Sequence, residues 1–145
     1  MNDIERLLIV DACRTLIHRY AYLNDARDFN ELVELFTEDA VFYRPSAPDD
    51  AIVGRDAILK SLQARSASTI TFHLCTDVLI EVASPQRASA RSRILLLSGT
   101  RSADGNPPDP ATLKPLLPGT FRDELVLTTS GWKFSRRSGR VWLAD

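Results

Sequence analysis

The apolar positions in the first half of the chain predict three helices. Between residues 9 and 23, apolar side chains recur every three or four positions, which is the period of a helix buried along one side. This stripe consists of Ile9, Cys13, Leu16, Ile17, Tyr20 and Leu23. Asn24 is expected to end the helix, since Asn tolerates the left-handed conformation. A second helix is predicted to start at Asp28, which can cap it, and a third to run from Arg55 to about Gln63.

The remaining segments favour strands. A short strand is predicted over residues 40–43, before a break at Pro45, Pro48, Asp49 and Asp50. Residues 69–82 alternate between apolar and polar types, as a strand with two different faces does. We expect Ile70, Phe72, Leu74, Val78, Ile80 and Val82 on one face, and Thr71, His73, Cys75 and Asp77 on the other. Strands are also predicted over 88–100, 119–128 and 132–141, with the last two joined in a hairpin at Ser130–Gly131.

Two segments of the strand region need a partner or a role. Residues 94–97 are apolar at every position, so both faces of the sheet need a cover there. A helix can cover one face, and a second subunit is the expected cover of the other. Residues 101–118 form a long loop, and loops of this length tend to be lids, binding loops or interface arms. This loop contains Pro107, Pro108, Pro110, Pro115 and Pro118.

The order of these elements indicates the fold class. Helices gathered before a run of antiparallel strands are typical of an α+β domain. We expect a single domain over residues 1–145, in which three N-terminal helices pack on a curved antiparallel sheet. Such a sheet forms a cone, and the open end of the cone is a ready pocket for a small molecule.

Composition narrows the classes of partner. The chain has 145 residues, of which 44% are hydrophobic, and can therefore bury a core without disulfides. A formal net charge of −1 argues against a nucleic acid or a membrane surface as partner. The two cysteines, and an N-terminus without a basic start or cleavage site, favour reduced thiols in the cytoplasm.

Motifs for metals and cofactors are missing from the sequence. His73 and Cys75 form one close pair of potential ligands, which is short of a zinc set. The chain has no glycine-rich phosphate loop, no dinucleotide fingerprint and no nucleophile elbow. We therefore expect neither a metal nor a cofactor.

Three groups of polar residues need an explanation beyond local structure. His73 lies in the middle of a strand. It is either a hydrogen-bonded structural histidine or a general acid or base. Asp25 is not needed as a cap, because Asp28 supplies one, so it is either a solvated carboxylate or the partner that orients an imidazole. The hydroxyls of Tyr20, Tyr22 and Tyr43 either bond to the backbone or polarise a substrate oxygen.

The sequence resembles the SnoaL-like branch of the nuclear transport factor two-like superfamily over essentially its whole length. The matching segments, in order, are residues 19–29, 35–42, 54–58, 72–73, 119–125 and 131–137. The resemblance implies a cone-shaped α+β barrel that is usually a homodimer. Dehydratase and dehydrochlorinase members pair a pocket Asp with a pocket His, which correspond here to Asp25 and His73. The pocket Tyr of the bile-acid dehydratase corresponds to Tyr20.

The resemblance also implies a function. We expect a cofactor-independent lyase or isomerase that acts on a small, mostly apolar cyclic or polyketide-like molecule. His73 would move the proton, Asp25 would hold the imidazole, and Tyr20 or Tyr43 would stabilise charge on oxygen. Residues expected to contact the substrate are Phe42, Tyr43, Cys75 and Phe121, the last standing where members of the family often have Tyr.

A second function stays open on the sequence alone. The same fold serves as a non-catalytic binding or scaffold subunit, such as the small subunit of a ring-hydroxylating dioxygenase. An enzyme should bring Asp25 and His73 within hydrogen-bond reach beside an open cavity. A scaffold should have that cavity filled by side chains, together with a large apolar outer face. In either case we expect a homodimer formed through the outer face of the sheet.

Overall fold

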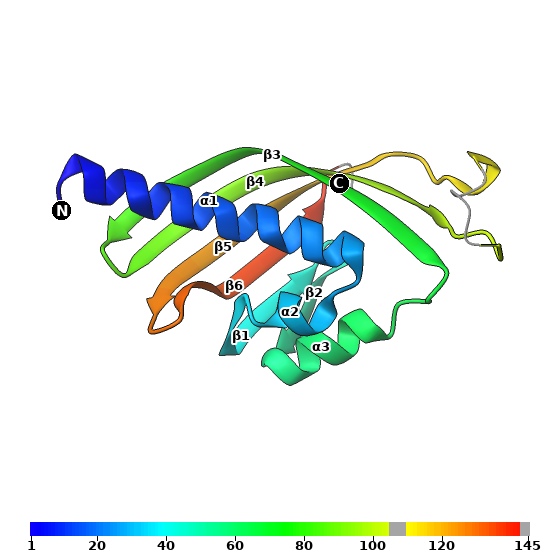
Figure 1. Cartoon of the computed structure of the whole chain (residues 1–145), viewed down its shortest axis with the longest axis horizontal. Coiled ribbons are helices and arrows are strands. Elements are labelled where there is room, and N and C mark those ends of the chain that lie inside the picture. The colour runs from blue at the N-terminus through cyan, green and yellow to red at the C-terminus, as the bar shows by residue number, and fades with distance from the viewer. Residues whose placement is uncertain (105–109, 143–145) are drawn as a thin grey trace.

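A computed structural model describes residues 1–104 and 110–142 of the chain. Three α-helices and a 3-10 helix accompany six strands (Figure 1). The helices are α1 (Asp3–Ala26), α2 (Phe29–Val33), α3 (Arg55–Gln63) and the 3-10 helix η1 (Pro110–Thr112). The strands are β1 (Phe36–Arg44), β2 (Ala47–Val53), β3 (Thr69–Ser84), β4 (Arg87–Thr100), β5 (Leu117–Thr128) and β6 (Gly131–Val141). No described helix is long and apolar enough to cross a membrane.

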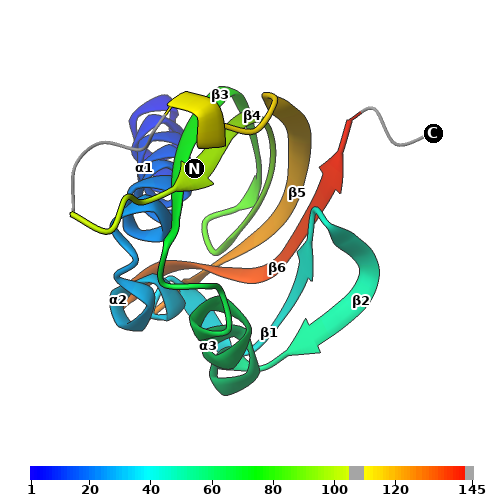
Figure 2. The same ribbon diagram turned by 90° about the vertical axis from the view of Figure 1, so that its right-hand side faces the viewer.

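The six strands form one sheet in the order β2-β1-β6-β5-β4-β3. All neighbouring strands are antiparallel except β1 and β6, which are parallel. Figure 2 shows the sheet curling strongly, with the three helices together on one side of it. Helix α1 packs along β3, while α3 packs against β1. The predicted α+β class is therefore confirmed, and the predicted bounds of the third helix agree with α3.

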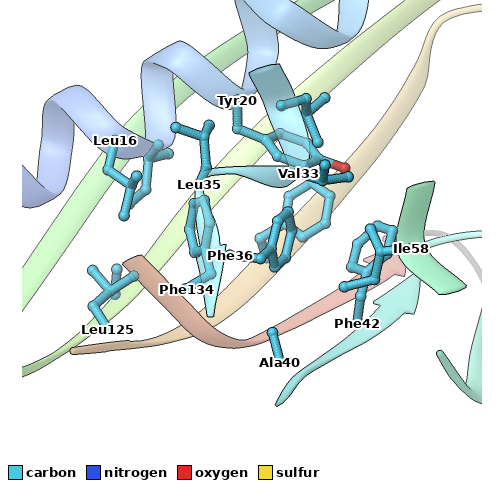
Figure 3. Close-up of a cluster of buried hydrophobic side chains, with 14 of the residues drawn as sticks. Leu16, Tyr20, Val33, Leu35, Phe36, Ala40, Phe42, Ile58, Leu125 and Phe134 are labelled. Atoms are coloured by element: carbon cyan, nitrogen blue, oxygen red, sulfur yellow. The ribbon is translucent and has the colours of Figure 1, made fainter. Parts of the chain in front are cut away.

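The core between α1 and the sheet is built from aromatic rings. Tyr20 on α1 makes edge-to-face contacts with rings on three strands (Figure 3). Its neighbours are Phe36, Phe42, Phe121 and Phe134, with ring centroids 6.0–6.3 Å from that of Tyr20. Each such pair contributes about 0.5–1.5 kcal/mol beyond the burial of its area. The helix and the sheet are therefore held at a fixed distance around this ring.

A bulge in β3 overturns the predicted alternation of that strand. The pairing of β3 with β4 shifts register between Thr76 and Leu79, and Asp77 has a left-handed φ of 50°. Before the bulge, Phe72 faces outward and is 59% exposed, whereas after it Ile80 packs against the core. The prediction that one apolar face runs unbroken through residues 70–82 is wrong, because an extra residue in one strand exchanges its two faces. The same bulge helps the sheet to bend into a cone.

Other element boundaries also differ from the predictions. Helix α1 continues past Asn24 to Ala26, and Arg27 takes the left-handed conformation instead, with φ of 58°. The segment 47–50, which was expected to break the chain, belongs to β2. Strand β2 lies at the edge of the sheet. Pro48 is tolerated there, because an edge strand does not need every backbone N–H for pairing with a neighbour. In the predicted loop 101–118, Pro107 and Pro108 lie outside the described residues, and Pro118 belongs to β5.

The outer face of the sheet carries an apolar patch on β3 and β4. Phe72 pairs with Leu97 across the two strands, and Leu74 pairs with Leu95. All four side chains are exposed. The expectation that residues 94–97 present apolar groups on both faces is confirmed, since Ile94, which precedes Leu95 on β4, is buried on the inner side.

Candidate active site

Asp25 and His73 meet inside the cone. Asp25 lies in the last turn of α1, and His73 lies on β3, along which α1 packs. Their side chains are joined between Asp25 Oδ1 and His73 Nδ1 at 2.5 Å. Both side chains are largely enclosed, with exposed fractions of 21% for Asp25 and 11% for His73. A carboxylate and an imidazole separated by 48 positions in the sequence thus form one unit.

Further hydrogen bonds fix the orientation of the Asp25 carboxylate. The Thr71 hydroxyl donates to Oδ1 at 2.8 Å, and the backbone N–H of His73 donates to Oδ2 at 2.8 Å. A carboxylate accepts hydrogen bonds, so the imidazole Nδ1 carries the proton that it shares with Asp25. The other ring nitrogen, Nε2, is thereby left as the basic atom of His73.

A cavity of about 350 Å³ lies beside the imidazole. His73 lines this cavity, whereas Asp25 lies behind it and does not. Much of the wall is apolar and is formed by Phe42, Leu62, Ile94, Leu96, Leu117 and Phe121. The volume is within the range of sites for small molecules. His73 therefore stands between a fixed carboxylate and an open space that can hold a guest.

Tyr20 lines the same cavity from the side of α1. The residue is only 3% exposed. Burial raises the pKa of Tyr20, while the positive charges of Arg137 and Arg65 and a hydrogen bond with Asn24 oppose the rise. Tyr20 is consequently a protonated hydroxyl at neutral pH and can donate a hydrogen bond.

The structure separates the other residues that were expected to contact a substrate. Phe42 and Phe121 line the cavity. Tyr43 does not, because successive residues of a strand face opposite sides, and its ring lies instead 4.7 Å from the Arg136 guanidinium. Cys75 is also outside the lining and is half-buried, with its thiol pKa raised by burial. Tyr43 and Cys75 therefore lie outside the lining of this cavity.

A buried ion pair next to Tyr20 was missed from the sequence. Arg137 and Asp123 are 1% and 0% exposed in their side chains, and Arg137 Nη1 donates to Asp123 Oδ2 at 2.8 Å. The guanidinium carbon lies 3.9–4.6 Å from the ring centroids of Tyr20, Phe121 and Phe134. The sequence patterns did not single out Arg137 as a buried residue. The sequence feature that could have indicated the buried pair is the position of Arg137 opposite Asp123 in the predicted hairpin.

The Asp123–Arg137 pair predicts a dependence of stability on pH. Burial raises the pKa of Asp123 to about 6, although Arg137 opposes the rise. Between pH 4 and 6 the folded chain therefore holds a proton that the unfolded chain has lost. This contribution to stability is complete below about pH 4 and disappears as the pH rises through 6, by on the order of 3 kcal/mol.

Urea unfolding of the wild type and of Asp123→Asn at several pH values measures this effect. We expect the unfolding free energy of the wild type, relative to the variant, to fall between pH 4 and 6. A difference between the two proteins that stays constant over this window would show that Asp123 titrates at its ordinary pKa.

Comparison with known proteins places this geometry in context. The model of a family described as the SnoaL-like domain matches residues 5–138. A solved structure of a provisionally assigned scytalone dehydratase from Novosphingobium aromaticivorans is similar, with 26% identity and a TM-score of 0.82, over 98% of this chain and 89% of that one. A hexachlorocyclohexane dehydrochlorinase shares the fold, with 20% identity and a TM-score of 0.79, over 97% and 90% of the two chains.

An NTF2-like protein with a cystatin-like fold from Novosphingobium aromaticivorans is also similar. It has 20% identity and a TM-score of 0.77, over 98% of this chain and 87% of that one. No curated protein sequence matches the chain. The solved structures therefore support the curved sheet with N-terminal helices independently of the sequence patterns.

Proposed function

This chain belongs to the SnoaL-like domain family, and on that premise we propose that it is a cofactor-independent lyase or isomerase acting on a small, largely apolar cyclic or polyketide-like molecule. The observation that carries the proposal is the position of His73, between the Asp25 carboxylate and the open cavity. A dyad of this kind is the arrangement in which an imidazole accepts a proton while a carboxylate holds its tautomer and stabilises its cation.

In the proposed reaction, His73 Nε2 removes a proton from a carbon next to a carbonyl group. The electron pair of the broken C–H bond moves toward the carbonyl oxygen, where Tyr20 donates a hydrogen bond to the developing negative charge. Asp25 stabilises the imidazolium that forms. The imidazolium then returns the proton to another carbon, in an isomerisation, or to a departing hydroxyl group, in a dehydration.

The apolar wall contributes by excluding water from the reacting atoms. Interactions between charges are stronger where water is absent, so the Asp25–imidazolium pair and the Tyr20 hydrogen bond gain strength when a guest fills the cavity. Phe42 and Phe121 would hold a ring by shape and apolar contact, without fixing its polar substituents.

The scaffold alternative has one observation in its favour, which is the apolar patch of Phe72, Leu74, Leu95 and Leu97. A second copy of this chain is the occupant that we propose for the patch. Sedimentation velocity would then show a dimer. This assembly is compatible with catalysis, because the patch lies on the outer face of the sheet and the cavity on the inner one.

Deuterium exchange tests the proposed chemistry without knowledge of the natural substrate. A panel of small cyclic ketones, such as 2-tetralone, is incubated in D₂O, and loss of the C–H signal beside the carbonyl is followed by NMR. The proposal requires the protein to accelerate exchange of at least one ketone beyond a matched imidazole buffer. If no ketone of the panel exchanges faster with the protein than in the matched buffer, the proposed function is contradicted.

A further inference from the structure

Within the described part of the chain, all charged residues that line the cavity are cationic. They are Arg44 and Arg65, and no Asp or Glu accompanies them. Arg44 is exposed, whereas Arg65 is half-buried. A mostly apolar cavity with a one-sided charge is complementary to a guest that is apolar over most of its surface and negative at one end.

Arg65 is held in place by contacts on several sides. It lies just after α3, and its Nη1 donates to Asn24 Oδ1 at 2.8 Å. Its guanidinium carbon lies 5.5 Å from the centroid of the Phe29 ring. Arg27, which lies over the same ring, donates to the backbone carbonyls of Arg65, Ser66 and Thr69. The position of the guanidinium is therefore set before any guest arrives.

The hydrogen-bonding capacity of Arg65 is mostly unused. A guanidinium has five N–H donors, and only the bond to Asn24 is made by this side chain within the described residues. No carboxylate lies within 4.0 Å of it in that part of the chain, whereas Arg19, Arg55 and Arg137 each have one. Burial lowers the pKa of the Arg65 guanidinium, yet arginine keeps its charge in proteins. A half-buried cation with no carboxylate in direct contact costs free energy that an anionic guest would recover.

From this geometry, and resting on the proposed function, we propose that the substrate is a cyclic carboxylic acid whose carboxylate binds Arg65. The planar guanidinium fits a carboxylate through two parallel hydrogen bonds. Arg65 also lies close enough to Tyr20 and Asp25 to interact with them electrostatically. A carboxylate at Arg65 therefore orients the ring between the hydrogen-bond donor Tyr20 and the base His73. This role makes Arg65 a specificity-determining residue.

Calorimetric titration with a matched pair of probes tests this proposal. The probes are 2-naphthoate and its neutral analogue 2-naphthamide, which have the same ring and nearly the same shape. Hydrogen bonds to charged groups are strong, so we expect 2-naphthoate to bind at least about tenfold more tightly than 2-naphthamide. In Arg65→Gln, which retains an amide that can donate to Asn24, the preference should disappear.

The matched control is Arg91→Gln. Arg91 is an exposed arginine outside the cavity lining, and its loss changes the net charge of the protein by the same amount. This variant should keep the preference for 2-naphthoate. Equal affinity of the wild type for both probes, no detectable binding of 2-naphthoate, or a preference that survives in Arg65→Gln would each overturn the proposal.

The binding measurement is independent of catalysis. His73→Ala removes the proposed base and should still prefer 2-naphthoate, because the carboxylate contacts Arg65. If ketone exchange fails while the Arg65-dependent preference is present, the proposed reaction is wrong and the carboxylate site stands. If exchange occurs without the preference, the proposed reaction stands and the carboxylate site is wrong.

Discussion

Replacement of His73 by alanine is expected to lower protein-catalysed deuterium exchange of a cyclic ketone by about 100- to 10,000-fold. This is the contribution of a positioned general acid or base to a proton transfer. The imidazole is the group of the dyad that lines the cavity, so its removal leaves Asp25 without a means of reaching the guest. The ratio of second-order exchange rates, measured by NMR on folded protein, gives the effect directly.

The other histidine of the chain provides the control. His18 lies on α1, is half-buried and is not part of the cavity lining. His18→Ala should therefore exchange the ketone at the rate of the wild type. A loss of less than about tenfold in His73→Ala would contradict the role of His73 as the base. Circular dichroism of both variants separates loss of chemistry from loss of fold.

Replacement of Asp123 by alanine is expected to lower the unfolding free energy by about 3–5 kcal/mol at neutral pH. The change removes the oxygen that accepts the buried Arg137 hydrogen bond, which a protonated Asp123 still supplies, and a charged donor left unsatisfied in the core is costly. Three aromatic rings in contact with the guanidinium oppose its movement out to water. Urea unfolding followed by fluorescence of the two tryptophans measures the change.

An exposed ion pair offers the comparison. Glu81 and Arg91 are joined at 3.2 Å, with side chains 70% and 61% exposed. Glu81→Ala should change the unfolding free energy by less than about 1 kcal/mol, since surface ion pairs contribute little. The double variant Asp123→Leu/Arg137→Met should recover part of the stability lost in Asp123→Ala, because it removes both buried charges. Equal losses of unfolding free energy in Asp123→Ala and Glu81→Ala would show that the Arg137 guanidinium becomes hydrated when Asp123 is removed.

The sequence was sufficient to predict the elements and to suggest the dyad. The helical period around Tyr20 and the apolar spacing within residues 55–63 reflect burial along one side, which a single sequence records directly. Asp25 was notable because Asp28 already capped the next helix, and the side chain of Asp28 does accept a hydrogen bond from the backbone N–H of Glu31. That Asp25 would reach His73 came from the family resemblance, since no periodicity links positions so far apart.

The errors have physical causes that a single sequence does not display. The bulge at Asp77 exchanges the faces of β3, and an aspartate in a strand pattern looks like any other polar outward position. Arginine is seldom buried, so the sequence does not mark Arg137 as a core residue, and only the strand register brings Asp123 to it. Arg65 lies beyond the end of α3, where its meeting with Asn24 depends on how the helices are placed. The packing of elements that lie far apart in the sequence therefore determines which polar residues meet at the cavity.

The protonation of the His73 ring is the most direct test of the central claim, which is that Asp25 holds the imidazole so that Nε2 is the base. The chain contains two histidines, so nitrogen-15 NMR of His18→Gln observes His73 alone. At a pH where the ring is neutral, we expect a proton on Nδ1 and a bare Nε2. A ring that carries its proton on Nε2 would have no basic nitrogen free for a guest, and this result would contradict the proposed function.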